Sequence, residues 1–141
     1  RNLRALSEPL AELLSEHLRD NPIPGEVLVP VPIHPRRWRE RGYNQSELLA
    51  RKLCQFTGLP LVDDCLIRQW HAIPQTQTKT AGERRQNVSK AFACRDRRLA
   101  NRKVLLIDDV ATSGATLDGC ARALKAAGAS SVWGLSLARD V

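Results

Sequence analysis

The stretch from Val104 to Thr116, VLLIDDVATSGAT, constrains the fold of this 141-residue chain more than any other. Its first four residues, Val104 to Ile107, form an unbroken apolar run, which is typical of a central parallel strand buried on both faces. A helix is predicted from Leu117 to Ala127, closed by Gly128, and a strand from Ser131 to Leu137. Strand, helix and strand at this spacing predict a right-handed parallel crossover.

The remaining elements follow from apolar periodicity and from capping signals such as Asn44 before a helix and Gly58 after it. In chain order they are a helix over Leu3–Leu18, a short buried strand over Glu26–Val31, a helix over Asn44–Thr57, a strand over Cys65–Trp70, a long polar loop over His71–Gly82 and a short basic helix over Glu83–Lys90. We therefore expect a single α/β domain over residues 1–141, with a mostly parallel twisted sheet flanked by helices.

Two acidic residues follow the central apolar run. In open parallel sheets ligands bind beyond the carboxyl ends of the strands, where Asp108 and Asp109 are expected to lie. Ionised carboxylates at that edge suit the neighbouring 2′- and 3′-hydroxyls of a ribose, because each carboxylate accepts two hydrogen bonds. The alternative is an acidic capping turn that merely starts the next helix.

The hydroxyl-rich turn after these acids is suited to a phosphate. Ala111, Thr112, Ser113, Gly114, Ala115 and Thr116 combine three hydroxyl side chains with a glycine at the start of a helix. Backbone N–H groups and the positive end of the helix favour an anion there. A Walker-type loop is excluded because no GK[ST] sequence is present. The combined pattern predicts a site for a phosphorylated ribose.

Composition sets limits on the class of protein. Apolar runs are too short for a membrane span and no secretory signal is evident, so a cytoplasmic location is the default expectation. The chain starts at Arg1 in a helical pattern, and we expect it to be the C-terminal part of a longer protein. Four cysteines without a CxxC or CxxH pair argue against a zinc site and predict buried free thiols. The formal charge of +7 is compatible with polyanionic partners.

A cluster of cations and aromatic rings lies between the first predicted strand and the second helix. Its members are Arg36, Arg37, Trp38, Arg39, Arg41 and Tyr43. Such a mixture is able to follow a single-stranded nucleic-acid backbone and stack its bases. Equally, the arginines serve a nearby anionic ligand and Trp38 simply packs. His34 is a candidate general base, although a lone loop histidine is more often structural. His17 and His71 are expected on the surface, and Trp70 and Trp133 in the core.

The chain resembles the ComF/GntX family of type I phosphoribosyltransferase-like proteins in three segments. VLLIDDVATSGAT resembles the phosphoribosyl pyrophosphate signature, VPVPIHPRRWRERGYNQSELLARKL resembles a proline-flanked strand followed by an R-G-aromatic-N-Q box, and QTQTKTAGERRQNVSKAF resembles the hood-loop segment. The match runs from Val27 to the C-terminus and implies a type I phosphoribosyltransferase-like fold. Family members usually carry an N-terminal cysteine-rich zinc module, which this chain lacks.

The resemblance implies a division of the site. Asp108 and Asp109, as catalytic and ligand-binding residues, would hold the ribose hydroxyls, and the backbone from Val110 to Thr116 would hold the 5′-phosphate. The loop of Val31, Pro32, Ile33 and His34 would face the pyrophosphate, and the segment Thr78–Arg85 would close over it. Family members need Mg²⁺, which a pyrophosphate binds together with several waters.

The reaction that the resemblance implies is displacement of pyrophosphate at the anomeric carbon through an oxocarbenium-like state. Arg84 and Arg85 are candidates for the cations that stabilise the leaving group, or else belong to a solvated helix face. We expect a protein that binds phosphoribosyl pyrophosphate and Mg²⁺ and is linked to DNA uptake in natural competence. The alternatives are an active phosphoribosyltransferase with an unknown acceptor, and an accessory protein that binds single-stranded DNA and has a non-catalytic pocket. A pocket kept for sensing or regulation is compatible with the accessory role. Competence-machinery proteins are further expected partners.

Overall fold

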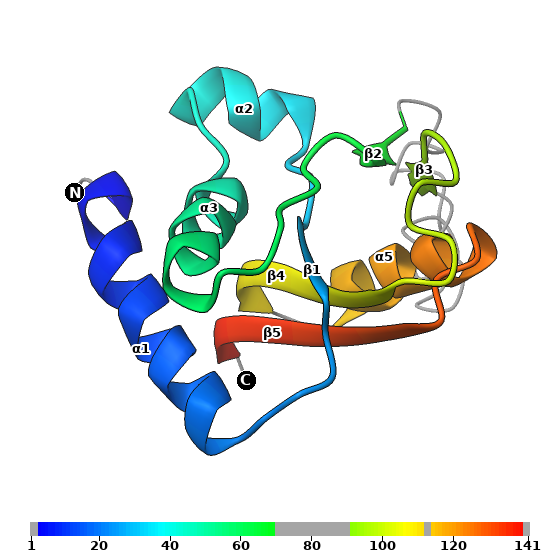
Figure 1. Cartoon of the computed structure of the whole chain (residues 1–141). Coiled ribbons are helices and arrows are strands. Elements are labelled where there is room, and N and C mark those ends of the chain that lie inside the picture. Colours follow the sequence, from blue (N-terminus) through cyan, green and yellow to red (C-terminus); the bar gives the residue numbers. More distant parts are fainter. Residues whose placement is uncertain (1–2, 70–90, 112–113, 140–141) are drawn as a thin grey trace.

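The centre of the molecule is a three-stranded parallel sheet. A computed structural model describes residues 3–69, 91–111 and 114–139. Its strands β1 (Val27–Pro30), β4 (Lys103–Ala111) and β5 (Ser131–Arg139) lie in the order β1-β4-β5 (Figure 1). The predicted α/β fold with a parallel crossover is confirmed, since β4 and β5 are parallel and α5 (Ala115–Ala126) connects them.

Strand β4 is buried on both faces, as its apolar run predicts. Val104 to Ile107 are almost completely inaccessible to solvent, and alternate residues point to opposite sides of the sheet. Val104 and Leu106 belong to one hydrophobic cluster, which also contains residues of α5, whereas Leu105 and Ile107 belong to a second cluster on the other face. The two clusters make β4 the central strand of the fold.

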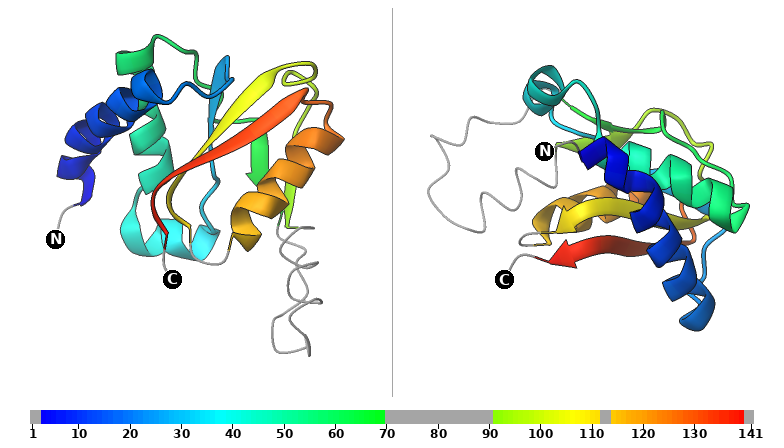
Figure 2. Two further views of the ribbon diagram at one scale, coloured as in Figure 1. Left: turned by 90° about the horizontal axis from the view of Figure 1, so that it is seen from below. Right: turned by 90° about the vertical axis from the view of Figure 1, so that its left-hand side faces the viewer.

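The second face is covered by α3 (Gln45–Thr57), and α1 (Ser7–Asp20) packs against α3. A short 3-10 helix, η1 (Leu3–Leu6), precedes α1 and completes the helix that the sequence predicts there. Helices α3 and α5 thus lie on opposite faces of the sheet (Figure 2). Within the described ranges no helix is both long enough and apolar enough to cross a membrane.

Helix α3 begins and ends where its sequence signals place it. The Asn44 side chain accepts a hydrogen bond of 3.1 Å from the Ser46 backbone, which caps the first turn. At the other end Gly58 adopts a left-handed conformation with φ of 76°, which glycine takes without steric cost. The predicted start and end of this helix are confirmed.

A small antiparallel pair lies beside the main sheet. Strand β2 (Leu66–Arg68) falls within the predicted strand Cys65–Trp70, and it pairs with β3 (Phe92–Cys94), which the sequence analysis did not predict. The preceding segment extends the main sheet, because Pro60 and Val62 exchange backbone hydrogen bonds of 2.9 Å with Leu28.

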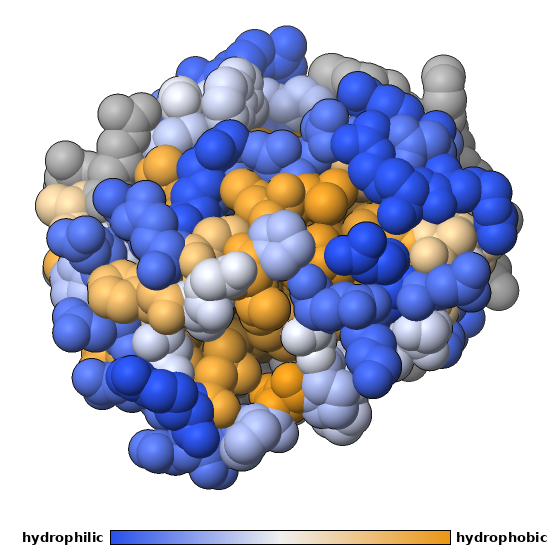
Figure 3. Space-filling model, in the orientation of Figure 1, coloured by the Kyte–Doolittle hydropathy of each residue, from blue (hydrophilic) through white to orange (hydrophobic). Residues whose placement is uncertain are grey.

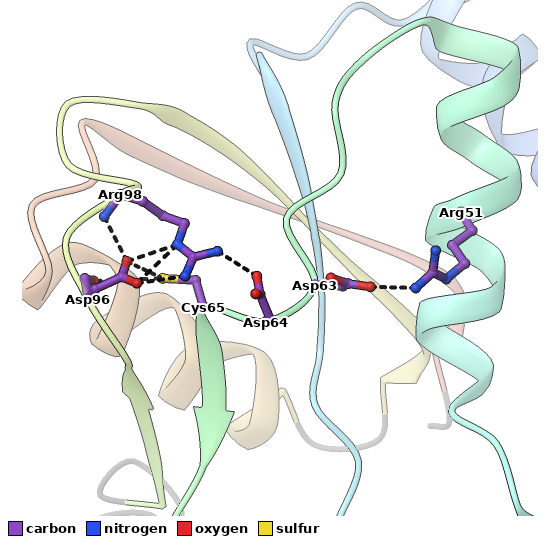
Figure 4. A network of polar contacts seen from close by, with 6 residues as sticks. All are labelled: Arg51, Asp63, Asp64, Cys65, Asp96 and Arg98. Carbon is purple, nitrogen blue, oxygen red and sulfur yellow. Dashed lines mark hydrogen bonds and ion pairs between the residues drawn. The ribbon is translucent and has the colours of Figure 1, made fainter.

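Two arginines hold this preceding segment from opposite sides (Figure 4). Arg51 on α3 reaches Asp63 at 2.6 Å, and Arg98 reaches Asp64 at 2.6 Å and Asp96 at 2.7 Å. Hydrogen bonds from Arg98 hold the pKa of Asp96 well below its usual range. Exposed ion pairs of this kind contribute little to stability, because water screens their charges. Their main effect here is to fix the path of residues 58–66 between α3 and β2.

The cysteines, histidines and tryptophans were each predicted to be buried or exposed, and the structure confirms some of these predictions and not others. All four cysteines are free, with two buried and two half-buried, and His17 is exposed as expected. Trp133 was predicted to lie in the core, but 47% of it is exposed. The reason is its position on β5, which is an edge strand of the described sheet and has a neighbouring strand on one side only. Trp70 and His71 lie outside the described residues.

Candidate functional site

The carboxyl edge of the sheet brings most of the predicted site residues together. Strand β1 ends at Pro30, whereas β4 continues to Ala111. Asp108 and Asp109 therefore lie inside β4, beyond the end of its neighbour, and do not leave the strand as the sequence analysis expected. Figure 2 shows the ends of β4 and β5, the start of α5 and helix α2 (Pro35–Arg41) at the same end of the molecule.

Side chains from the start of α3 take over the hydrogen bonding where β1 leaves β4. The last ladder bond joins the Val31 N–H to the Ile107 carbonyl at 2.9 Å. The next bond of a parallel ladder would join the Asp109 N–H to the Val31 carbonyl. Instead, the Asp109 N–H donates to Ser46 Oγ at 3.2 Å, and Asn44 Nδ2 donates to the Val31 carbonyl at 3.1 Å.

Asp108 is the more buried of the two acids, with 7% of its surface exposed. Its Oδ1 accepts hydrogen bonds from Ser46 Oγ at 3.2 Å and from the Asp109 backbone N–H at 2.9 Å. Burial is the main reason that the pKa of Asp108 is raised to about 6. A hydrogen bond with Asp109 and the charge of that residue raise it further, whereas the hydrogen bond from Ser46 lowers it. Asp109 is half-buried and is the more accessible carboxylate.

The turn after β4 leads directly into a helix at this edge. Gly114 has φ of 80° in the left-handed region, and α5 starts at Ala115, two residues earlier than predicted. The Gly114 carbonyl accepts the N–H of Asp118 at 2.9 Å, which closes the first turn. Ala115 and Thr116 are half-buried beside it. This placement directs the N-terminal end of α5 towards the carboxyl edge, where an anion is favoured.

Part of the predicted phosphate turn is not described. Val110 and Ala111 form the end of β4, and only their backbone is placed. Thr112 and Ser113 lie outside the described residues. Their role in holding a 5′-phosphate stays a prediction.

The loop of Val31, Pro32, Ile33 and His34 leads into α2, a helix that the sequence analysis missed. Its signals were present, because Pro35 occupies the first helical position and Gly42 ends the helix with φ of 77°. His34 caps the helix through Nδ1, which accepts the Arg36 N–H at 3.0 Å. Burial and the charges of nearby arginines lower the pKa of His34, so the imidazole is neutral at pH 7.

Helix α2 carries the cluster of cations that the sequence analysis singled out. None of its residues is buried, and Arg36, Arg37, Arg39 and Arg41 are all exposed. Trp38 is 48% exposed, so part of it is accessible to a partner while the rest is covered by the protein. The structure thus places these cations and one indole ring together on a short surface helix, next to the loop that ends in His34.

Arg68 is a candidate that sequence reasoning overlooked. It stands at the end of β2 with its guanidinium 5.0 Å from the centre of the Phe92 ring. Burial, with a further contribution from the charge of Arg37, lowers the pKa of Arg68, and its own charge acts on His34. Within the described ranges no carboxylate forms an ion pair with it. A half-buried cation in this position favours an anionic ligand. Its signal in the sequence was a single charge within the apolar strand.

An open groove of about 360 Å³ lies between the end of β1, α2, α3 and β2. Its lining combines apolar residues with the cations Arg68 and Arg95 and with the acids Glu47, Asp63 and Asp64. These acids form ion pairs with Arg51 or Arg98. The groove therefore offers apolar surface next to charged groups of both signs. Figure 3 shows one face of the molecule, with hydrophobic side chains near its centre and hydrophilic ones around them.

The remaining predicted residues belong to a stretch outside the described part of the chain. They are Arg84, Arg85 and the whole segment Thr78–Arg85. The two residues that flank the undescribed stretch, Gln69 and Ala91, are joined by a backbone hydrogen bond of 2.5 Å. Among the described residues no group of three or more His, Cys, Asp or Glu side chains is arranged to hold a metal ion.

Comparison with known families gives a match over most of the chain. The family model described as "Phosphoribosyl transferase domain" matches residues 10–138. Competence protein F of Haemophilus influenzae is 38% identical over 118 residues, which cover 80% of this chain and 51% of that protein. Competence protein ComFC of Bacillus subtilis is 34% identical, over 81% of this chain and 45% of that protein. DNA utilization protein YhgH of Escherichia coli K12 is 31% identical, over 74% and 45%. The chain spans about half the length of these relatives.

Solved structures confirm the fold class. The glutamine phosphoribosylpyrophosphate amidotransferase of B. subtilis has a TM-score of 0.65 at 19% identity, over 96% of this chain and 27% of that one. The purine phosphoribosyltransferase of Pyrococcus horikoshii has a TM-score of 0.54 at 17% identity, over 93% and 70%. At these identities the likeness concerns the fold alone.

Proposed function

Because this chain belongs to the phosphoribosyl transferase domain family and is similar to the ComF competence proteins, we propose that it binds phosphoribosyl pyrophosphate with Mg²⁺ at the carboxyl edge of its sheet. The names of its relatives link them to competence and to DNA utilization. We extend that link to this chain as a role in DNA uptake, exercised in the cytoplasm with competence-machinery proteins as partners.

The observation that carries this proposal is the position of the acidic pair. Asp108 and Asp109 lie beyond the end of β1, and a left-handed turn at Gly114 starts helix α5 a few residues later. Carboxylates there accept hydrogen bonds from the ribose hydroxyls, and the start of α5 favours the 5′-phosphate. The accessible Asp109 is suited to direct contact, while Asp108 is held in place by its protein partners.

The pyrophosphate is assigned to the loop Val31–His34 and to Arg68. The loop ends at His34, the cap of α2. The positive charge of Arg68 lowers the pKa of His34, which indicates a positive electrostatic potential beside the loop. The donor set fits Mg²⁺, because the ion takes one or two carboxylates together with phosphate oxygens, and Asp108 and Asp109 supply the carboxylates. When bound, Mg²⁺ would neutralise charge on the pyrophosphate.

An active phosphoribosyltransferase remains the alternative reading of the same site. In that reaction the bond between the anomeric carbon and pyrophosphate breaks while an acceptor forms the new bond. The chain would contribute by orienting the ribose through Asp108 and Asp109 and by stabilising the leaving pyrophosphate through Arg68. An acceptor is required for turnover, and the groove beside Trp38 is a candidate position for it.

A second candidate function is single-stranded DNA binding by α2. The observation that favours it is the exposure of four arginines and Trp38 on one short helix. Arginines contact phosphates and an exposed indole ring stacks on a base, which together bind single strands without strong sequence preference. This function is compatible with a pocket for phosphoribosyl pyrophosphate that serves sensing or regulation.

The decisive experiment for the proposed pocket is calorimetry with magnesium phosphoribosyl pyrophosphate. Asp108→Asn combined with Asp109→Asn should weaken binding by at least about 1.5 kcal/mol, the low end for charged hydrogen bonds. The charge-matched control is Glu16→Gln with Asp20→Asn, two exposed residues of α1. Equal affinity in the two double variants would refute the assignment of the acidic pair. Pyrophosphate release with a panel of bases and amines then distinguishes an enzyme from a binding protein.

A further inference from the structure

We propose that Asn44 and Ser46, at the start of α3, are positioning residues that hold the pyrophosphate loop and the acidic pair in a fixed relation to each other. The proposal rests on the proposed function of this edge and assigns roles to two residues of the R-G-Y-N-Q-S segment. The sequence predicted Asn44 only as the cap of a helix and assigned no role to Ser46. They act through the groups that contact the ligand and are not themselves catalytic.

Ser46 is placed to control the acidic pair directly. Only 4% of its surface is exposed, and its hydroxyl is used both as donor and as acceptor. It donates to Asp108 Oδ1 and accepts the Asp109 backbone N–H, each at 3.2 Å. A hydroxyl group has one proton to donate, so donation to Asp108 fixes its rotation. The two bonds together fix the Asp108 carboxyl group relative to the β4 backbone.

Asn44 makes the corresponding connection to the loop. Its Nδ2 donates to the Val31 carbonyl at 3.1 Å, and its Oδ1 accepts the Ser46 N–H at 3.1 Å. A single side chain thus joins the first turn of α3 to the first residue of the pyrophosphate loop. These bonds form just beyond the last hydrogen bond of the β1–β4 ladder. Side chains at the start of α3 therefore bind backbone groups that a longer β1 strand would otherwise have paired.

The consequence is that the ribose and the pyrophosphate of a bound phosphoribosyl pyrophosphate depend on one helix. Helix α3 is thirteen residues long and packs Leu49, Ala50 and Leu53 into the core. Loop and acids are otherwise separated by more than 70 residues of sequence, from Val31 to Asp108. Elements held by such a scaffold keep the geometry that binding and reaction require.

The test compares four variants in binding of magnesium phosphoribosyl pyrophosphate and of ribose 5-phosphate. S46A removes both hydroxyl bonds, and S46T retains the hydroxyl group. N44D retains the capping oxygen but loses the donor to Val31. S15A removes a buried serine of α1, for which no hydrogen bond to the loop or to the acidic pair is found in the described part of the chain, and is the matched control. Circular dichroism and thermal unfolding establish that each variant is folded.

We expect S46A to weaken the binding of both ligands by roughly tenfold. The reason is that the Asp108 carboxyl group, which contacts the ribose, loses the hydrogen bond that orients it, and a hydrogen bond to a charged group has an effect of that size. S46T should restore most of the affinity, because it retains the hydroxyl group that holds the Asp108 carboxyl group. N44D should weaken the binding of phosphoribosyl pyrophosphate more than the binding of ribose 5-phosphate. It alters the pyrophosphate loop, and ribose 5-phosphate has no pyrophosphate group for that loop to hold.

The outcomes separate this proposal from the proposed function. If the unaltered chain fails to bind phosphoribosyl pyrophosphate, both are overturned. If it binds and S46A and N44D retain its affinity and ligand discrimination, only the positioning role is overturned. If S46A does not fold, N44D decides the question, because it keeps the helix cap.

Discussion

His34 Nδ1 lies 3.0 Å from the backbone nitrogen of Arg36 and accepts its hydrogen bond, which makes His34 the cap of α2. An accepting Nδ1 places the proton of a neutral imidazole on Nε2. Burial and the positive charges around the ring, Arg68 foremost among them, keep the pKa of His34 below its ordinary value. The sequence left open a general base and a structural residue, and this geometry supports the structural role.

Replacing His34 therefore distinguishes a cap from a base. His34→Asn keeps a capping oxygen, whereas His34→Ala removes the cap at a cost of about 1 kcal/mol to the helix. Hydrogen exchange of the α2 amides should accelerate about fivefold in the alanine variant, since 1 kcal/mol corresponds to that factor, and should change little in the asparagine variant. Loss of pyrophosphate release in the asparagine variant, with α2 protection intact, would instead identify His34 as catalytic.

The raised pKa of Asp108 predicts an unusual dependence of stability on pH. The native state binds this proton more tightly than the unfolded chain, so between about pH 4 and the native pKa of about 6 the contribution of Asp108 to stability rises as the pH falls. Urea unfolding of the unaltered chain and of Asp108→Asn at pH 4.5 and 6.5 measures the effect. Relative to the asparagine variant, the unaltered chain should be more stable at pH 4.5 than at pH 6.5. A constant difference would contradict the assignment.

Ligand binding should show the opposite trend over the same range. A ribose is bound best by the ionised carboxylate, so the affinity for magnesium phosphoribosyl pyrophosphate should decrease below about pH 6, by at most about tenfold per pH unit for one proton. Calorimetry at pH 5.5, 6.5 and 7.5 checks this. An affinity independent of pH would show that Asp108 does not bind in its ionised form.

Much of the fold was predictable because local signals and the final structure agree. The apolar run Val104–Ile107 predicted the central strand, and Asn44 and Gly58 predicted both ends of α3. Strand β3 was not predicted, because three residues carry too little pattern and its pairing with β2 depends on the tertiary structure. Helix α2 was missed although Pro35 and Gly42 mark its ends.

The site was predictable in its residue types but not in its contacts. The sequence treats Asp108 and Asp109 as equivalent, whereas the structure buries one and leaves the other more accessible. Successive side chains of a strand point to opposite faces of the sheet, and Asp108 is in addition held by Ser46, which is 62 residues away in the sequence. A contact between residues so far apart in the chain leaves no local pattern in the sequence. Arg68 was overlooked for the same reason, since only the fold brings its charge near His34.

Arg68 offers a prediction that separates a ligand contact from a structural role. Arg68→Gln should weaken binding of magnesium phosphoribosyl pyrophosphate by about tenfold or more and that of ribose 5-phosphate much less. It should also raise the pKa of His34, because one of the charges that lower that pKa is removed. NMR titration of His34 measures the second effect without any ligand. Arg102→Gln, an exposed arginine just before β4 at the opposite edge, is the control. A raised pKa of His34 with unchanged affinity would exclude Arg68 from the pyrophosphate site.

The exposed arginines of α2 give the test for single-stranded DNA binding. If Arg36, Arg37 and Arg39 contact phosphates, replacing all three by alanine should reduce the slope of log affinity against log salt concentration by up to about 2, since each phosphate contact to a single strand contributes about 0.7. The charge-matched control replaces Arg19, Arg102 and Arg122, three exposed arginines on other parts of the surface. Trp38→Ala should lower the affinity without altering the slope, because stacking releases no counterions. Equal slopes for the two triple variants would leave α2 without a role in binding DNA and would assign its arginines to the pyrophosphate edge.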